Sequence, residues 1–150
     1  MTMEESKMKL IHYGSYFYTP GLIRPIRNRA TINKPLGGLW ASPIDAEFGW
    51  KDWLLAEDWE TERLNWWFEF EIDTTNMYMI DCYADLKALI CESRGTIDFE
   101  LISKSIDAIY LTAKGMERTR MNPRGGIEGS LYGWDCECVL IMNPAIIQST

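Results

Sequence analysis

Some features that would place the chain in a membrane, a secretory route or a zinc protein are missing from the sequence. No apolar run reaches the roughly 18–20 residues of a membrane span, and the polar segment Met1–Lys9 lacks the apolar core of a secretory signal. Histidine occurs once, and the four cysteines show C-x8-C and C-x-C spacings without a CxxC pair. We therefore expect a cytoplasmic protein with reduced thiols, no membrane partner and no bound metal.

Signature loops and positive charge are also scarce. The chain contains no GxGxxG, GxxxxGK[ST] or G-x-S-x-G motif, so common phosphate loops and the serine-hydrolase elbow are absent. The 15 basic residues are outnumbered by 22 acidic ones, which gives a net charge of −7. A protein that coats DNA or RNA normally needs a basic surface, so the total charge argues against that class. Positive charge is concentrated in residues 24–34 and 114–126, which predicts a local rim for an anionic ligand or acceptor.

What the sequence does contain predicts one α+β domain over residues 1–150. Hydrophobic residues make up 47 % of the chain and charged residues 25 %, as in an ordinary globular protein. Apolar patterns predict strands at Met8–His12, Leu39–Ser42, Trp66–Ile72, Met77–Ile80, Ile106–Leu111 and Cys136–Met142. Helices are predicted around Trp50–Trp53, over Tyr83–Ser93 with Asp81 as N-cap, and over Phe99–Ser105 with Asp98 as N-cap. The glycine- and proline-rich segments 13–37 and 112–134 are predicted as loops, and the last strand as central because both of its faces are apolar.

Three features are candidates for chemistry. His12, the only histidine, ends the first predicted strand, where it either satisfies backbone groups or serves a site. Glu137 lies in an otherwise apolar strand, and a carboxylate there is unfavourable unless it is paired or faces a cleft. The aromatic residues Trp40, Phe48 and Trp50 fit a core, but seven tryptophans exceed what a core of this size needs. We expect one or two of them to line a flat ligand pocket.

Three segments, taken in order, resemble the His-Tyr-Glu type pattern of the ADP-ribosyltransferase superfamily. They are LIHYGS (10–15), GLWASPIDAEFGWKDW (38–53) and ECVLIMNPAIIQ (137–148), and together they extend over nearly the whole chain. The shared pattern is a first strand ending in His, a glycine-opened strand followed by a helix with an aromatic residue, and a late strand that begins with Glu. The resemblance implies a split β-sandwich of two small sheets with short helices, as in a small bacterial or phage effector.

The resemblance also implies that NAD is consumed as a substrate. Nicotinamide would be released, and the ADP-ribosyl group would pass to an unknown acceptor macromolecule, either a protein or a nucleic acid. His12 would hydrogen-bond the ribose of the nicotinamide half, and Glu137 would stabilise the oxocarbenium-like transition state as nicotinamide leaves. Trp50 would stack on the nicotinamide ring, with Phe48 and Trp53 as alternatives.

The remaining implied roles concern binding. Ser42 would help to orient the nicotinamide half, and Tyr13 and Gly14 belong to the same cofactor-binding segment as His12. Arg24 and Arg27 would receive the NAD pyrophosphate, and residues 118–134 would present or select the acceptor.

The sequence departs from the family pattern at two positions. The central aromatic residue of the family is usually Tyr, where this chain has Trp50, and Asp135 replaces the Glu or Gln of arginine-modifying relatives. An active enzyme would be a mono-ADP-ribosyltransferase or an NAD glycohydrolase. The alternative is a non-catalytic binding or inhibitor module on the same fold. An RNA 2′-phosphotransferase is the least favoured, because its arginine–histidine set is incomplete here.

Overall fold

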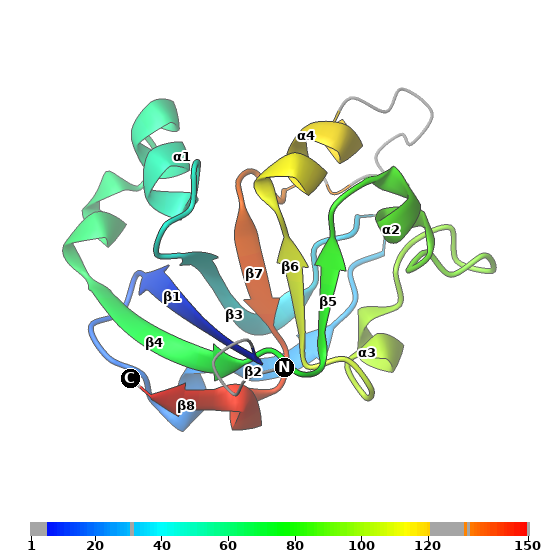
Figure 1. Cartoon of the computed structure of the whole chain (residues 1–150), viewed down its shortest axis with the longest axis horizontal. Helices are drawn as coiled ribbons and strands as arrows, with labels where there is room; N and C mark the ends of the chain where they lie inside the picture. The colour runs from blue at the N-terminus through cyan, green and yellow to red at the C-terminus, as the bar shows by residue number, and fades with distance from the viewer. Residues whose placement is uncertain (1–5, 31, 121–130, 132, 150) are drawn as a thin grey trace.

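The computed structural model describes residues 6–30, 32–120, 131 and 133–149, and these residues form a mixed sheet flanked by short helices (Figure 1). The described strands follow one hydrogen-bonded path in the order β5-β6-β7-β3-β1-β4-β8, with β2 paired to β3. Their bounds are β1 Lys7–Tyr13, β2 Arg24–Arg27, β3 Leu36–Pro43, β4 Trp67–Asp73, β5 Met77–Ile80, β6 Ala108–Leu111, β7 Cys138–Ile141 and β8 Ile147–Ser149. The α+β class is thereby confirmed.

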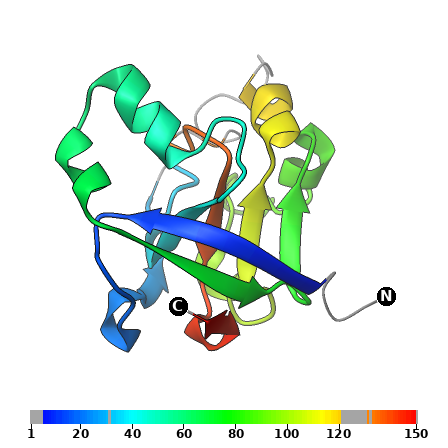
Figure 2. The same ribbon diagram turned by 60° about the vertical axis from the view of Figure 1, so that its left-hand side comes forward.

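Strand β3 lies between β1 and β7 and makes the centre of the sheet. Ile11 of β1 is paired with Ser42 of β3, while Trp40 of β3 is paired with Leu140 of β7. All described neighbours are antiparallel except β5 and β6, which run in parallel. All four residues of β7 are buried, as expected for a central strand. Figure 2 shows β1 and β4 crossing at a steep angle to β5, β6 and β7.

The helices lie at two ends of the sheet. Their bounds are α1 Trp50–Glu57, α2 Tyr83–Lys87, α3 Phe99–Ile102 and α4 Ala113–Arg120, with 3-10 turns η2 Pro20–Leu22, η3 Thr61–Asn65 and η4 Pro144–Ile146. Helix α1 lies toward the β1–β4 side, and α2, α3 and α4 lie toward β5 and β6 (Figure 1). None of the helices that the structure describes is long and apolar enough to cross a bilayer.

Two hydrophobic clusters hold the sheet and helices together. One cluster, built around Phe99, Trp134 and Leu140, packs with the partly buried Trp40, Trp50 and Trp53. The other forms where alternate residues of β1 and β4 are buried, including Leu10, Phe68, Phe70 and Ile72. The alternating pattern of residues 66–72 therefore predicts the buried face of β4 correctly. Trp66 is the exception, because it precedes β4 and is 48 % exposed.

Both predicted loops contain regular structure that the sequence analysis did not anticipate. Segment 13–37 includes η2 and β2, because the Arg24–Arg27 backbone pairs with the start of β3. Segment 112–134 includes α4, where Gly115 does not break the helix. A Cβ at Gly115 would lie 1.9 Å from the Ile80 carbonyl oxygen, so glycine permits close packing of α4 against β5. Strand β8 was also not expected, and residues 121–130 and 132 lie outside the described part of the chain.

Helix caps were predicted with mixed success. Asp98 caps α3 as expected, since its carboxylate accepts a hydrogen bond from the Leu101 N–H at 3.1 Å. The α3 helix nevertheless ends at Ile102 rather than at residue 105. The prediction that Asp81 caps α2 is wrong: Cys82 holds that position, and the Asp81 carboxylate accepts a hydrogen bond from Thr112 of the neighbouring β6–α4 connection. Helix α2 also ends at Lys87 rather than at residue 93, with Leu86 as its buried anchor.

Candidate functional site

A cavity of about 450 Å³ opens between α1 and the adjoining parts of β1 and β3. This volume is in the range of small-molecule sites. Its lining combines aromatic and charged side chains, chiefly His12, Lys34, Trp40, Trp50, Trp53, Arg63 and Asp135. Two of the sequence-predicted site residues, His12 and Trp50, therefore meet in one cavity, and Tyr13 also lines it.

His12 enters the cavity as a neutral ring with a defined tautomer. Its Nδ1 lies 2.7 Å from the carbonyl oxygen of Trp40, and a carbonyl only accepts, so Nδ1 carries the proton. Burial lowers the pKa of His12, the Trp40 hydrogen bond raises it, and the charge of Arg63 lowers it further. The net lowering keeps the ring neutral at physiological pH, which leaves the Nε2 lone pair as a hydrogen-bond acceptor.

The chain just after His12 is fixed against the start of β4. The Gly14 N–H donates to the Trp66 carbonyl at 2.6 Å, and Gly14 has a φ of 117°. That conformation is unfavourable for residues with a side chain, so glycine suits this turn. Burial raises the pKa of the adjacent Tyr13, and the charges of Asp52 and Glu69 raise it further. Tyr13 is therefore a neutral phenol at the edge of the cavity.

Tryptophan rings form much of the cavity wall. The Trp50 ring packs edge-to-face against Trp40, with centroids 6.1 Å apart, and against Trp53, with centroids 5.8 Å apart. The same contact continues from Trp53 to Trp59 at 5.6 Å and from Trp40 to Trp134 at 4.7 Å. Four of these rings, those of Trp40, Trp50, Trp53 and Trp59, line the cavity and form its aromatic wall.

Lys34 places a positive charge against this aromatic wall. Its Nζ lies 5.3 Å from the ring centre of Trp40 and 5.4 Å from that of Trp50, both within cation–π range. The same ammonium donates a hydrogen bond to the Gly133 carbonyl at 2.9 Å. Burial lowers the pKa of Lys34, although the charge of Asp135 opposes that shift.

Glu137 lies beside this cavity but does not line it. The residue is only 6 % exposed, and it directly precedes β7. One carboxylate oxygen accepts from the Glu47 N–H at 3.1 Å, and the other accepts from the Tyr110 hydroxyl. Burial, that hydrogen bond and the Glu137 charge together raise the pKa of Tyr110 far above its usual value, so the phenol remains a donor.

Ser42 joins Glu137 to helix α1. Its hydroxyl donates to the backbone carbonyl of Glu137 at 2.8 Å and accepts from the backbone N–H of Trp50 at 3.0 Å. Ser42 thus binds the first residue of α1 and the residue before β7 to the middle of the sheet. His12 and Glu137 lie on the two sides of β3, two strand spacings apart, or roughly 10 Å between backbones.

The two arginines predicted at the site lie elsewhere. Arg24 and Arg27 are exposed on β2, where they pair with Gly38 and Leu36 of β3, and neither lines the cavity. Of that basic segment it is Lys34 that reaches the cavity, and Lys34 is one of the four cations predicted to form a positive rim. In the second basic segment, Arg118 is exposed, and Arg124 lies outside the described residues.

Sequence reasoning missed Tyr110 and Arg63 as well. Tyr110 lies in β6, and its contact with Glu137 depends on pairing between β6 and β7, in which it faces Val139. Arg63 lies in η3 and forms an ion pair with Glu60 at 2.7 Å at the rim of the cavity. Neither residue belongs to a recognisable local motif, so only the register and tertiary packing reveal them.

Among the described residues, no group of three or more His, Cys, Asp or Glu side chains could hold a metal ion. The four cysteines are free thiols in the structure, two of them buried. Comparison with protein-family models, with curated proteins and with solved structures finds no match to this chain.

Proposed function

We propose that the protein cleaves NAD and transfers its ADP-ribosyl group to an acceptor macromolecule. One observation carries the proposal: the three strands that bear the resembling segments, β1, β3 and β7, are direct neighbours in the sheet. Their ordered placement puts His12 and Glu137 on either side of Ser42. The steep angle between β1–β4 and β5–β7 supports the split sandwich that the resemblance implies (Figure 2).

Each side chain suits a definite task in that reaction. The unprotonated Nε2 of His12 accepts a hydrogen bond from a ribose hydroxyl of NAD. The Glu137 carboxylate stabilises the positive charge that develops on the ribose as its bond to nicotinamide breaks. Nicotinamide keeps the electron pair of that bond and leaves as a neutral molecule. The acceptor then forms a bond to the same ribose carbon and loses a proton.

The hydrogen bonds of Glu137 are compatible with this role. A carboxylate oxygen has more than one lone pair, so an oxygen that accepts from Tyr110 or Glu47 can accept a further hydrogen bond. The two donors also fix the orientation of the carboxylate in advance, and such preorganisation is what electrostatic stabilisation requires. Ser42 orients the same region by holding Glu137 and Trp50 at once.

A non-catalytic NAD-binding module is the second candidate, and one observation favours it. The Glu137 carboxylate is outside the cavity that His12 lines, and Glu137 is only 6 % exposed. A protein that keeps this carboxylate buried when NAD is bound would hold the ligand without cleaving it. The two candidates share the binding residues and differ in what Glu137 does.

The experiment is a nicotinamide-release assay combined with calorimetric NAD binding on the wild type and on Glu137→Gln. The substitution keeps the shape of the side chain, so we expect unchanged NAD affinity and a loss of release of about a hundredfold or more. Glu71→Gln in β4 is the matched control and keeps full release, since Glu71 pairs with Lys7 away from the cavity.

Three other results would each decide between the readings. The non-catalytic module is supported if the wild type binds NAD but releases no nicotinamide with any lysate that is added as a source of acceptor. Absence of NAD binding overturns both candidates. Release that is equal in the wild type and in Glu137→Gln removes Glu137 from the catalytic site.

A further inference from the structure

The backbone around Lys34 is anchored more firmly than its loop position suggests. Asn33 is fully buried, and its side-chain oxygen accepts from the Ile97 N–H at 2.8 Å. The Asn33 carbonyl accepts from the Trp134 indole N–H at 2.6 Å, and Pro35 is buried on the other side. Lys34 is therefore held between two buried residues, so its side chain enters the cavity from a fixed point.

Asp135 also lines the cavity and its charge favours the protonated form of Lys34, but no described carboxylate pairs directly with this ammonium. Its one hydrogen bond in the described structure is to the neutral Gly133 carbonyl, and no described carboxylate lies within 4.0 Å of Nζ. An ammonium has three N–H donors, so two are left for another partner. A half-buried charge without a partner is unfavourable, and an anionic ligand in the cavity would relieve that cost.

The Trp50 ring that the ammonium contacts carries a further unpaired donor. The indole Nε1 of Trp50 is buried and has no hydrogen-bond partner in the described structure, and buried polar groups of this kind are uncommon. Lys34 Nζ lies 5.4 Å from the centre of the same ring. The indole N–H is enclosed, so the donors that a ligand in the cavity can reach are those of the Lys34 ammonium. Their partner is an acceptor, and the positive charge favours an anion.

We infer that this cavity binds a flat aromatic molecule that bears a phosphate or carboxylate, with the anionic group held by the Lys34 ammonium. The ring of the ligand packs against the tryptophan wall formed by Trp53 and Trp59. A ring that carries positive charge is disfavoured at this position, because Lys34 already lies against Trp40 and Trp50.

This inference does not depend on the role of Glu137. It rests on the proposed function only for the name of the anionic group that binds at Lys34. If the protein uses NAD, the group at Lys34 is one of the NAD phosphates. If it does not, the cavity still selects an anionic aromatic molecule. The chemistry shared by the two cases is an anion fixed to a flat ring.

The test is isothermal calorimetry with three probes that share one ring and differ in charge: indole-3-acetate, indole-3-acetamide and tryptamine. We expect the anion to bind at least about tenfold more tightly than the neutral amide, and tryptamine to be the weakest. Adenosine monophosphate and adenosine form a second pair, which distinguishes a phosphate ligand from a carboxylate ligand. Equal binding of charged and neutral members in both pairs would overturn the inference.

Variants at Lys34 connect the selectivity to the residue. Lys34→Met keeps the apolar stem and removes the charge, so we expect the preference for the anion to disappear, whereas Lys34→Arg retains much of it. Lys104→Met, at an exposed position, is the matched control and binds the probes as the wild type does. An unchanged anion preference in Lys34→Met would contradict the assignment. Glu137→Gln keeps the same probe affinities, which separates this result from the test of catalysis.

Discussion

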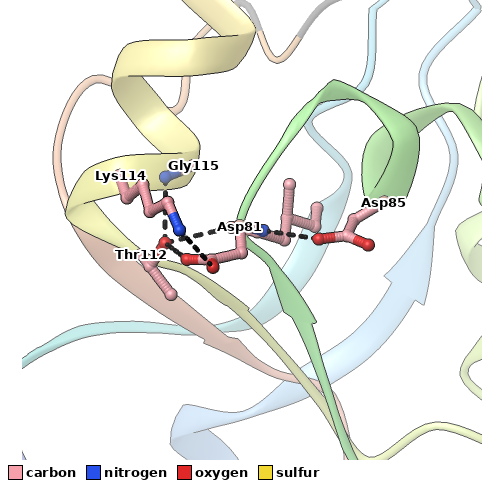
Figure 3. A network of polar contacts seen from close by, with 6 residues as sticks. Asp81, Asp85, Thr112, Lys114 and Gly115 are labelled. Carbon is pink, nitrogen blue, oxygen red and sulfur yellow. Dashed lines mark hydrogen bonds and ion pairs between the residues drawn. The ribbon is translucent and has the colours of Figure 1, made fainter.

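Two polar clusters in this molecule differ in how completely their groups are paired. The first, here called the Asp81 cluster, comprises Asp81, Asp85, Thr112, Lys114 and Gly115 where β5 and β6 end (Figure 3). The Thr112 hydroxyl donates to Asp81 at 2.6 Å and accepts from the Gly115 N–H at 2.9 Å. The Asp81 N–H donates to Asp85 at 2.9 Å, and Lys114 lies 3.5 Å from the Asp81 carboxylate.

The cavity beside α1 is paired much less completely. There the Trp50 indole N–H has no partner among the described residues. The Lys34 ammonium contacts a neutral carbonyl and two ring faces, and the Asp135 charge acts on it without a direct ion pair. A satisfied cluster contributes to folding, whereas unpaired donors reduce stability until a ligand completes them. The contrast assigns the Asp81 cluster to structure and the cavity to binding, and the following variants test it.

Thr112→Val has the largest expected effect on stability. It removes the hydrogen bond to Asp81 and the hydroxyl that caps α4, so we expect the free energy of unfolding to fall by about 2 kcal/mol in urea titrations. Thr75→Val is the matched control, because Thr75 makes a similar 2.6 Å bond to Asp73 at an exposed turn. For Thr75→Val we expect the free energy of unfolding to fall by about 0.5 kcal/mol or less. If the two variants lose the same free energy of unfolding, the Asp81 cluster does not stabilise the fold more than an exposed turn does.

Tyr110→Phe comes next, because it removes one of the two donors that hold the buried Glu137 carboxylate. An oxygen left without its partner costs about 1–2 kcal/mol, measured by the same urea titration. The control is Tyr16→Phe, which alters a side chain that is 60 % exposed and should leave stability unchanged. A wild-type value for Tyr110→Phe would show that the contact contributes nothing to folding.

Lys34→Met is expected to act in the opposite direction. Removing a half-buried ammonium that lacks a direct ion pair should raise the free energy of unfolding by up to about 1 kcal/mol at neutral pH. Burial lowers the pKa of Lys34 below 10.5, so the unfolded state binds more protons as pH approaches that value. The difference in the free energy of unfolding between Lys34→Met and the wild type should therefore shrink as pH rises to 10.5. A destabilised variant would place Lys34 among the structural residues.

His12 should give the smallest effect, visible only in acid. Its pKa is lowered from 6.5 by burial, so below pH 6.5 the unfolded state takes up more protons than the folded state. Stability is fully present above pH 6.5 and declines as pH falls toward the lowered value. Melting temperatures recorded from about pH 8 to about pH 5 should fall less steeply for His12→Asn than for the wild type. Parallel curves would show that His12 does not contribute to the acid dependence.

The sequence predicted those elements whose pattern is local. Alternation at Trp66–Ile72 indicated the buried face of β4, and apolar residues on both faces placed β7 in the sheet centre. Local rules failed where tertiary contact decides the outcome. Gly115 indicated a loop but lies inside α4, because the close approach of the β5 backbone requires a residue without a side chain.

The site shows the same division. His12 was a candidate because it ends a strand, Trp50 was a candidate through the family resemblance, and both line the cavity. Lys34 could not be distinguished from the arginines near it, since its placement depends on bonds from Asn33 to residues 64 and 101 positions away in the chain. The net charge of a segment is readable from sequence, whereas the burial of one of its charges is not.

The tryptophan wall also gives the protein an optical property. Successive ring centroids lie 4.7, 6.1, 5.8 and 5.6 Å apart along the series Trp134, Trp40, Trp50, Trp53 and Trp59. Indole rings this close exchange excitation energy and couple their electronic transitions. Near-ultraviolet circular dichroism from the coupled rings, four of which line the cavity, will therefore report on the cavity without an added label.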